Sequence, residues 1–371
     1  MNAHQVVRLV LTVGAVLSYA GLATVAATPI RQLTAAQQAS LRPALSPDGQ
    51  RVAFQRNEGD GRYRIWVMDA DGGGAKRLTT GDADDRHPAW SPDGRTLAVD
   101  SGSDNRREIW LIDVASAQRT QVTKLGGVAS FPTFRPDGAR IAFLAYREGG
   151  TDLWTIGRDG ANAQRITTDL ASEQRQQCTF ACHGAAWSPR GDRIAISSGD
   201  QSRVLVLAPT PGSVPLSISP EDEKAHFPTY LADGRLVYVS EHITLDQSWT
   251  DLWAQPADEG SARTALVMGV QAQGPFEISR DAGQLLFASP RTGTFEIYAV
   301  TLDDAGKAAL AERVVRGGGG AQASLTPGAV ASAQRKDAGP FGESTPYVIA
   351  LVAIGLVGLG VELFVRARRA R

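Results

Sequence analysis

The sequence has almost no excess of charge of either sign. Its 371 residues include 38 Lys and Arg and 39 Asp and Glu, which gives a formal net charge of -1 at pH 7. Proteins that bind nucleic acid carry a basic patch or stripe, and no such cluster stands within the central part of this chain. We therefore expect no nucleic-acid partner.

The signatures of several enzymes and ion sites are missing as well. Gly-x-Ser-x-Gly, which places a hydrolase nucleophile on a sharp strand-to-helix turn, does not occur. Asp82, Asp84 and Asp85 lie on one segment, but they lack the spacing of the twelve-residue calcium loop. We interpret that segment as a solvated loop and at most a weak binding surface. The sequence thus predicts a protein without a cofactor that is not an enzyme.

Cysteine is rare, and both cysteines stand close together. Cys178 and Cys182 lie in the one connection of the central region that is clearly longer than its equivalents. Outside the cytoplasm such a pair is expected to form a disulfide that staples the loop. His183 follows directly, but Cys-x-x-x-Cys-His has one residue more than the usual haem attachment motif, so we expect no haem.

Long apolar runs are confined to the two ends of the chain. Residues 9–27 follow Arg8, contain no charge and end in Val25, Ala26 and Ala27, which suit signal peptidase. We interpret residues 1–27 as a secretory signal, with an uncleaved membrane anchor as the alternative. Both interpretations place the body of the protein outside the cytoplasm.

The C-terminal apolar run has the length of a transmembrane helix. Residues 346–365 are apolar apart from Glu362 and, at 1.5 Å per residue, would span about 30 Å. The arginine-rich tail 366–371 follows, and positive charge stays on the cytoplasmic side. We expect a single-pass membrane protein with a cytoplasmic C-terminus. The tail also loosely resembles bacterial C-terminal sorting signals, so its removal by a membrane protease is the alternative.

One turn motif recurs six times, at intervals of about 45 residues. An apolar or aromatic residue precedes Ser-Pro-Asp-Gly or a variant of it, and the copies begin at Leu45, Trp90, Phe134, Trp187, Tyr230 and Ile278. Pro fixes φ, Asp binds backbone amides and Gly accepts positive φ, so each copy predicts a tight turn between two strands. Arg190 in the fourth copy and Ala282 in the sixth depart from the pattern.

Further strands are predicted after each turn. In the first repeat they are the alternating segment 52–54, the segment 65–67 with Trp66, and the short segment 77–79. We expect the large side chains at the position of Trp66 to be core; in the fourth repeat Leu205 stands where the other repeats carry an aromatic residue. A period of this kind is typical of propeller blades. We predict an all-β fold, a six-bladed β-propeller of four-stranded blades over residues 28–316, plus a single C-terminal transmembrane helix.

The two ends of a propeller must be joined. Residues 31–34 carry the pattern of a fourth strand but precede the first repeat, so they are expected to complete the last blade and to remove an open edge. The alternative is that residues 313–315 supply this strand locally. Residues 317–345, rich in Gly, Ala and Ser, are interpreted as a flexible linker to the membrane.

The succession Trp-Ser-Pro-Asp-Gly, Ile-Ala-Phe, Ile-Trp and Arg-Leu-Thr resembles the repeat of the TolB-type propeller family. The resemblance covers residues 31–316. It implies protein interaction, as in periplasmic TolB, or the noncatalytic propeller of prolyl-oligopeptidase-like enzymes. The segment between the last repeat and the membrane segment is too short to hold a catalytic domain of that kind.

Side chains at the blade entries are expected to face the central channel. We expect the partner, an envelope protein or an extracellular ligand, to bind there, at Arg42, Arg86, His87, Phe131, His183, His226 and Phe227. In the alternative interpretation, His87, His183 and His226 converge on zinc or another transition metal. The chain would then be a metal-dependent lyase or hydrolase that acts on polysaccharide fragments. The simpler alternative is that each histidine hydrogen-bonds to backbone.

Overall fold

A computed structural model describes residues 30–303, apart from 37, 104, 148–149, 169–183, 199–201, 244–247, 259, 271–275 and 291. Among these residues no helix is long and apolar enough to cross a membrane. The predicted signal, linker, transmembrane segment and arginine-rich tail lie outside the described residues. So do Cys178, Cys182 and His183, and with them the predicted disulfide.

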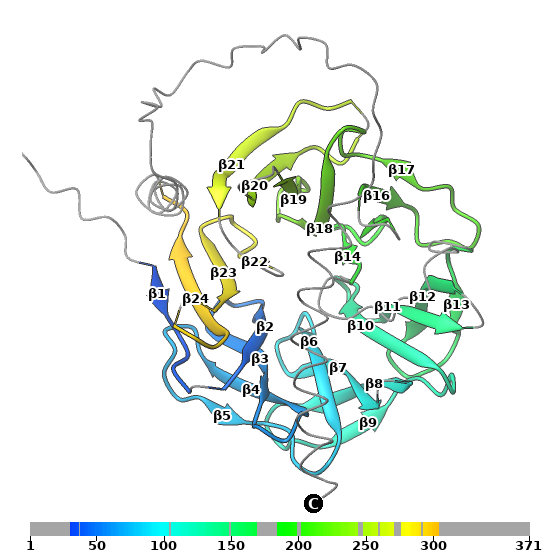
Figure 1. The fold of residues 1–371 in the computed structure, drawn as a ribbon. Coiled ribbons are helices and arrows are strands. Elements are labelled where there is room, and N and C mark those ends of the chain that lie inside the picture. The colour runs from blue at the N-terminus through cyan, green and yellow to red at the C-terminus, as the bar shows by residue number, and fades with distance from the viewer. Residues whose placement is uncertain are drawn as a thin grey trace, which may run out of the picture. The chain divides into compact units, whose positions relative to one another are not determined.

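The described part of the chain is built of strands, which occupy four successive positions from the axis outward (Figure 1). The inner strands are β2 (Ser40–Leu45), β6 (Asp84–Trp90), β10 (Val128–Phe134), β14 (Ala186–Trp187), β18 (Lys224–Tyr230) and β22 (Phe276–Ile278). The second strands are β3 (Arg51–Asn57), β7 (Thr96–Ser103), β11 (Arg140–Arg147), β15 (Ile194–Ser197), β19 (Leu236–Ile243) and β23 (Gln284–Ser289).

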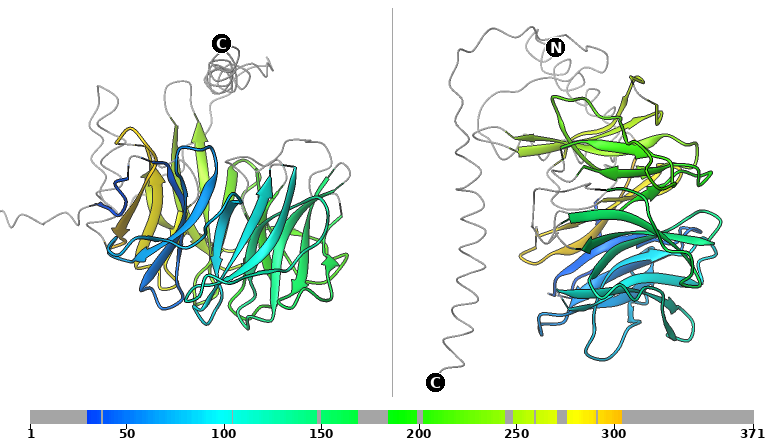
Figure 2. Two further views of the ribbon diagram at one scale, coloured as in Figure 1. Left: turned by 90° about the horizontal axis from the view of Figure 1, so that it is seen from below. Right: turned by 90° about the vertical axis from the view of Figure 1, so that its right-hand side faces the viewer.

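The outer two positions complete this arrangement. The third strands are β4 (Tyr63–Asp69), β8 (Arg106–Asp113), β12 (Gly150–Gly157), β16 (Val204–Leu207), β20 (Ser248–Gln255) and β24 (Glu296–Thr301). The outermost strands are β5 (Lys76–Arg77), β9 (Arg119–Gln121), β13 (Gln164–Arg165), β17 (Leu216–Ser217), β21 (Thr264–Val270) and β1 (Arg31–Gln32). Figure 2 shows the ring edge-on, with the strand groups standing side by side.

Hydrogen bonds join the strands into four sheets of four strands and one sheet of eight. The large sheet consists of β6 to β9 and β10 to β13, which meet in a single parallel pairing of Val128 with Arg107. That pairing forms because the Arg107 amide donates to the Gly127 carbonyl at 3.0 Å. The prediction of an all-β propeller agrees with this fold. The hydrogen-bonded sheets number five rather than the predicted six blades, because the second and third repeats share one continuous sheet.

The N-terminal segment completes the sheet of the last repeat. Arg31 and Gln32 pair antiparallel with Ala299 and Tyr298 of β24. The Leu33 amide donates to the Ile297 carbonyl at 2.7 Å, and the Ile297 amide donates to the Thr34 hydroxyl at 2.9 Å. The expected closure by residues 31–34 is therefore present, and residues 313–315 lie outside the described part of the chain.

The repeated turns form as their sequence predicts. In the first, the Ser46 hydroxyl donates to Asp48 at 2.5 Å and the Gly49 amide donates to the Ser46 carbonyl at 2.8 Å. Gly49 has a φ of 71°. In the fourth turn, where Arg190 replaces the aspartate, the Ser188 hydroxyl donates instead to Asp192 at 2.7 Å. The fourth turn thus keeps a hydrogen bond from its serine hydroxyl to an aspartate, although the usual aspartate is replaced by Arg190.

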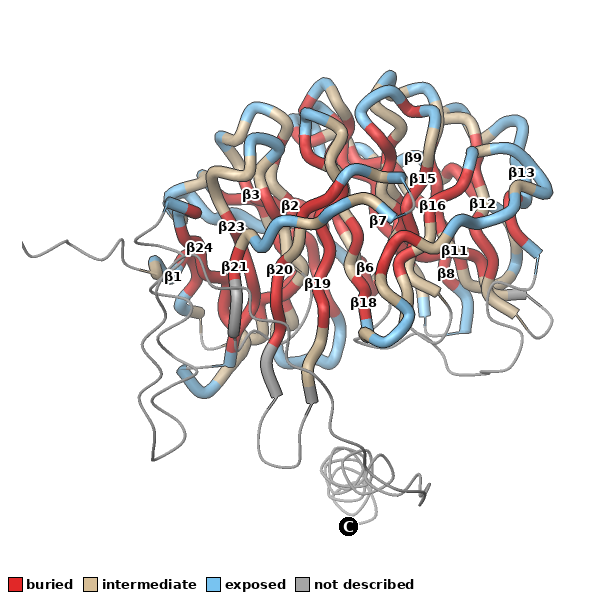
Figure 3. The backbone as a smooth tube through the Cα atoms, turned by 90° about the horizontal axis from the view of Figure 1, so that it is seen from above, coloured by how far each residue is buried: buried red, intermediate tan, exposed pale blue. Residues whose placement is uncertain are grey.

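The core lies between neighbouring strand groups, and Figure 3 shows buried backbone through the strands and exposed backbone at the turns. The tryptophans of the second and fourth turns reach the preceding repeat. Trp90 donates its indole N–H to the Ala44 carbonyl at 2.9 Å, and Trp187 donates to the Thr133 carbonyl at 3.3 Å. The expectation that the third-strand aromatics are core needs correction. Trp66 and Trp110 are only partly buried and pack against the edge of the core, with the guanidinium groups of Arg56 and Arg119 over their rings.

Candidate functional site

Four inner strands are interrupted at the same place. Their register shifts, so that one residue leaves the ladder, and we call its place the bulge position. The residues there, each followed by Pro, have left-handed backbones with φ between 52° and 59°: Arg42, His87, Phe131 and Phe227. Pro removes the amide that the ladder needs, which favours a bulge. A non-glycine residue in this conformation costs of order 1–3 kcal/mol, and such strain is concentrated at functional sites.

The bulges border a pocket on the axis of the ring. Its volume is about 670 Å³, and all six repeats line it. The lining runs in each repeat from the bulge position to the turn, within the segments 42–49, 87–92, 131–136, 184–189, 227–232 and 276–281. We call this the axial pocket. Because every repeat contributes to it, the pocket is a product of the fold rather than of one loop.

Side chains from the bulge positions of three repeats meet on one phenylalanine. The His87 ring lies 3.9 Å from the Phe131 ring, centroid to centroid. The Arg42 guanidinium carbon lies 5.4 Å from the same ring, a cation–π contact. Burial lowers the pKa of Arg42 to about 10, although Asp100 opposes the shift, so the side chain remains a cation at neutral pH.

His87 is also bound from behind by a carboxylate. Its Nδ1 lies 2.7 Å from Oδ1 of Asp100, which is fully buried on β7. Burial lowers the pKa of His87, which favours the neutral ring with Nδ1–H donating to Asp100. Burial opposes ionisation of Asp100, but contact with His87 and the charge of Arg107 hold its pKa below the usual value. The Nε2 atom is left as an acceptor that can take a proton or a metal ion.

Two further side chains hold the strained backbones. The His87 amide donates to the side-chain oxygen of Gln55 at 3.0 Å, and the Phe227 amide donates to the Ser197 hydroxyl at 3.3 Å. Gln55 and Ser197 occupy the same position on the second strand of the preceding repeat. The neighbouring repeat therefore supplies the acceptor that each bulge requires.

The predicted channel residues divide into two groups. Arg42, His87, Phe131 and Phe227 line the axial pocket, whereas Arg86 and His226 do not. Arg86 forms an ion pair with Asp84 at 2.7 Å and covers the Tyr63 ring. His226 is buried one residue before the bulge, with its ring edge-on to Phe227 at 4.2 Å.

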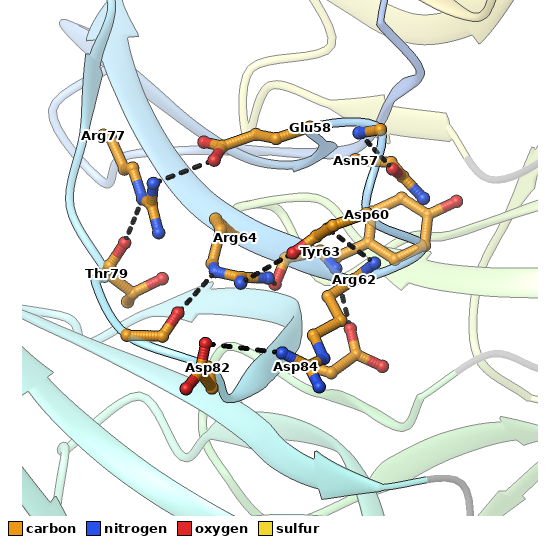
Figure 4. Close-up of polar contacts among 12 residues, drawn as sticks. Asn57, Glu58, Asp60, Arg62, Tyr63, Arg64, Arg77, Thr79, Asp82 and Asp84 are labelled. Carbon is orange, nitrogen blue, oxygen red and sulfur yellow. Dashed lines mark hydrogen bonds and ion pairs between the residues drawn. The ribbon is translucent and has the colours of Figure 1, made fainter.

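The acidic segment before His87 is not a solvated loop, which corrects the expectation from the sequence. Asp84 and Asp85 belong to β6, are buried, and form ion pairs with Arg107 and Arg119 from the next strands. Asp84 also accepts the Tyr63 amide at 2.8 Å. Only Asp82 is exposed, 3.4 Å from Arg62 (Figure 4).

The proposed histidine triad is not assembled by the residues that are described. His87 and His226 occupy different positions of the repeat, and His183 lies outside the described residues. Across the described ranges no group of three metal-ligating side chains occurs. The metal site therefore stays a prediction.

Asp100 and Glu277, which also reaches this site, were missed by sequence reasoning. Both had a signal. Asp100 is a charged residue directly after the apolar segment Leu97–Val99, where other repeats carry Gln55, Leu144, Ser197 or Val239. Glu277 stands where the other five repeats carry Ala or Thr.

Comparison with known proteins identifies the repeat. The family described as the TolB beta propeller domain matches residues 85–250. Residues 85–250 therefore carry the repeat of a TolB-like β-propeller. Tol-Pal system protein TolB from Anaeromyxobacter dehalogenans is 51% identical over 45 residues, which is 12% of this chain and 10% of that protein. The match thus spans about a tenth of the length of its curated relatives.

Solved structures share the fold of this TolB-like propeller. TolB from Acinetobacter baumannii is 18% identical with a TM-score of 0.55, covering 72% of this chain and 61% of that one. An oligogalacturonate lyase in complex with manganese is 15% identical with a TM-score of 0.53, covering 74% and 93%. The gluconolactonase XC5397 from Xanthomonas campestris is 16% identical with a TM-score of 0.52, covering 75% and 92%. At these identities the likeness concerns the fold alone.

Proposed function

We propose that this protein is a membrane-tethered, extracytoplasmic six-bladed propeller that binds an envelope protein or an extracellular ligand in its axial pocket, without making or breaking a bond. The observation that carries the proposal is the set of strained bulge residues. Arg42 and His87 both contact Phe131 at the pocket, and the three residues come from three different repeats. Binding explains their conformational cost better than folding does.

The family supports an interaction role. The curated relatives are named as the Tol-Pal system protein TolB. The apolar segment at residues 346–365 and the arginines after it support the membrane tether, and the N-terminal segment supports export. The count of six blades follows if the eight-stranded sheet is divided at its single parallel pairing.

The test uses the full chain in its own membrane. Arg42→Gln, Phe131→Ala and Phe227→Ala are introduced singly, and the partner is captured by crosslinking. Arg62→Gln is the control, because Arg62 is half exposed on the β3–β4 turn beside Asp82, outside the axial pocket. The proposal predicts that the three pocket variants lose the captured species and that the control retains it. Unchanged capture by all three would refute it.

One observation favours a second function, a metal-dependent lyase or hydrolase acting on polysaccharide fragments. A histidine that ligates metal usually donates its other ring N–H to a carboxylate, as His87 does to Asp100. A structural neighbour is an oligogalacturonate lyase in complex with manganese. Elemental mass spectrometry of the purified chain separates the two: one metal per chain, lost in His87→Ala, supports the enzyme, and no metal after incubation with zinc and manganese supports the scaffold.

A further inference from the structure

One carboxylate projects into a ring of small side chains. The residue directly before each repeated turn lines the axial pocket, and we call this the wall position. Five repeats place a small residue there and the sixth places a glutamate: Ala44, Ala89, Thr133, Ala186, Thr229 and Glu277. Small wall residues keep the pocket open, so the glutamate is the single long polar side chain of this ring.

Glu277 stands on the innermost strand of its sheet, opposite Leu286 on β23 and next to β2 of the first repeat. It forms no ion pair with any residue that the structure describes. Burial raises the pKa of its carboxyl group to about 7, although hydrogen bonding to the Leu45 backbone and the charge of Arg280 oppose the shift. Among the described residues, the carboxyl group of Glu277 is thus influenced by the charge of Arg280 without forming an ion pair.

The surroundings of Glu277 suit an alkylammonium group. Phe276 and Phe227 both line the pocket, with rings 6.4 Å apart and edge to face, and offer apolar contact to a methylene chain. Asp48 and Asp281 line the same pocket, and hydrogen bonds from Ser46 and Ser279 lower their pKa values, so both remain anions. Arg42 and Arg280 line the pocket too, so its charge is mixed and a cation is favoured only where the carboxyl groups stand.

We propose that the axial pocket contains a subsite for a primary alkylammonium group, with Glu277 as its receptor, and that the group it takes is a lysine side chain of the partner protein. This rests on the proposed function, since the pocket must be the place of capture. A lysine carries the ammonium on a four-carbon stem, which fits a carboxylate set beyond apolar walls. A free small amine offers the same chemistry, and the test distinguishes the two sources.

The test measures binding of defined probes to the full chain in detergent by saturation-transfer NMR. The probes are n-pentylammonium, pentan-1-ol and pentanoate, which share size and differ in charge. At pH 8 we expect only n-pentylammonium to bind, and we expect Glu277→Gln to weaken it roughly tenfold, the usual scale of a hydrogen bond to a charged group. Glu221→Gln is the control, because the Glu221 side chain is 83% exposed and lies outside the pocket.

The source of the amine is decided by a second pair of probes, acetyl-Gly-Lys-Gly-amide and the same peptide with an acetylated lysine. Tighter binding of the first than of either its acetylated form or n-pentylammonium supports a protein lysine. Tighter binding of n-pentylammonium than of the lysine peptide would overturn that part and indicate a small amine. Equal binding of n-pentylammonium to the wild type and to Glu277→Gln would overturn the subsite. The proposed function fails separately, and only if the Arg42, Phe131 and Phe227 variants capture the partner as the wild type does.

Discussion

Nδ1 of His87 lies 2.7 Å from Oδ1 of Asp100, and the two residues come from adjacent strands of the second repeat. The bond fixes the ring beside Phe131 and leaves Nε2 without a hydrogen bond among the described residues. Asp100 is fully buried, so its charge depends on His87 and on Arg107, whose Nη1 lies 3.9 Å from Oδ2. The His87–Asp100 pair therefore fixes the orientation of the His87 ring in the axial pocket and holds β6 against β7.

Asp100→Asn tests the tautomer that this bond imposes. A carboxylate only accepts, whereas the amide of Asn can donate to Nδ1, so the ring is free to carry its proton on Nε2. Since the charge of Asp100 raises the pKa of His87 against burial, the substitution lowers that pKa further. Nitrogen-15 NMR of the imidazole follows both changes. An unchanged tautomer and pKa would show that Asp100 does not control the ring.

Glu277→Gln is expected to change stability in a pH-dependent way. The folded-state pKa of about 7 lies above the ordinary value of 4.5, so the protonated form stabilises the fold below about pH 4.5 and this contribution is lost as the pH rises through 7. Gln cannot ionise. The variant is therefore more thermostable than the wild type at pH 8, by a few degrees, and equal to it at pH 4.5. A difference in melting temperature that does not vary with pH would contradict the burial of Glu277.

The acidic segment of the second repeat offers a matched pair of variants. Asp85→Asn removes a fully buried carboxylate from Arg119, whose side chain is 24% exposed, and is expected to cost about 2–4 kcal/mol in the free energy of unfolding. Asp82→Asn removes a charge that is 97% exposed, and it is expected to change stability by less than about 0.5 kcal/mol. Urea unfolding of the two variants gives both values. Equal effects would mean that the ion pair with Arg119 adds nothing.

The sixth turn contains a residue, Ala282, whose substitution is expected to raise the stability of the protein. Ala282 has a φ of 59° at the place where the first turn has Gly49. A left-handed alanine is strained by about 1–2 kcal/mol, part of which is offset by the greater freedom of Gly in the unfolded chain. Ala282→Gly is expected to stabilise the protein by up to about 1 kcal/mol. Gly234→Ala, at a φ of 88° with open space around it, is expected to destabilise by a similar amount.

The sequence predicts the fold well because the same turn and strand patterns recur in each repeat. The Ser-Pro-Asp-Gly turns, the apolar strand after each turn and the closing strand at Arg31 all follow from local chemistry and from the period. The site is predicted less well, because its geometry depends on the bulge. The register shift after Arg86 moves His87 to the pocket and leaves Arg86 beside Asp84, a distinction that spacing alone does not show.

Contacts between residues far apart in the sequence could not be predicted from the sequence either. Asp84 and Asp85 are polar residues in a run that is typical of a loop, and only the partners Arg107 and Arg119, more than twenty residues further on, make their burial possible. Asp100 required no distant information, since a charged residue directly after an apolar strand segment already indicates a buried polar contact.

A photocrosslinking amino acid at Thr133 tests the central claim most directly. Thr133 is at the wall position of the third repeat and lines the axial pocket, whereas Ser116 lies exposed on the turn between β8 and β9 and serves as the control. The full chain is irradiated in its native membrane. Capture in the pocket predicts a defined adduct from position 133 that disappears when Arg42→Gln is added, and none from position 116. An adduct from position 116 alone would contradict the account and place the partner on the outside of the ring.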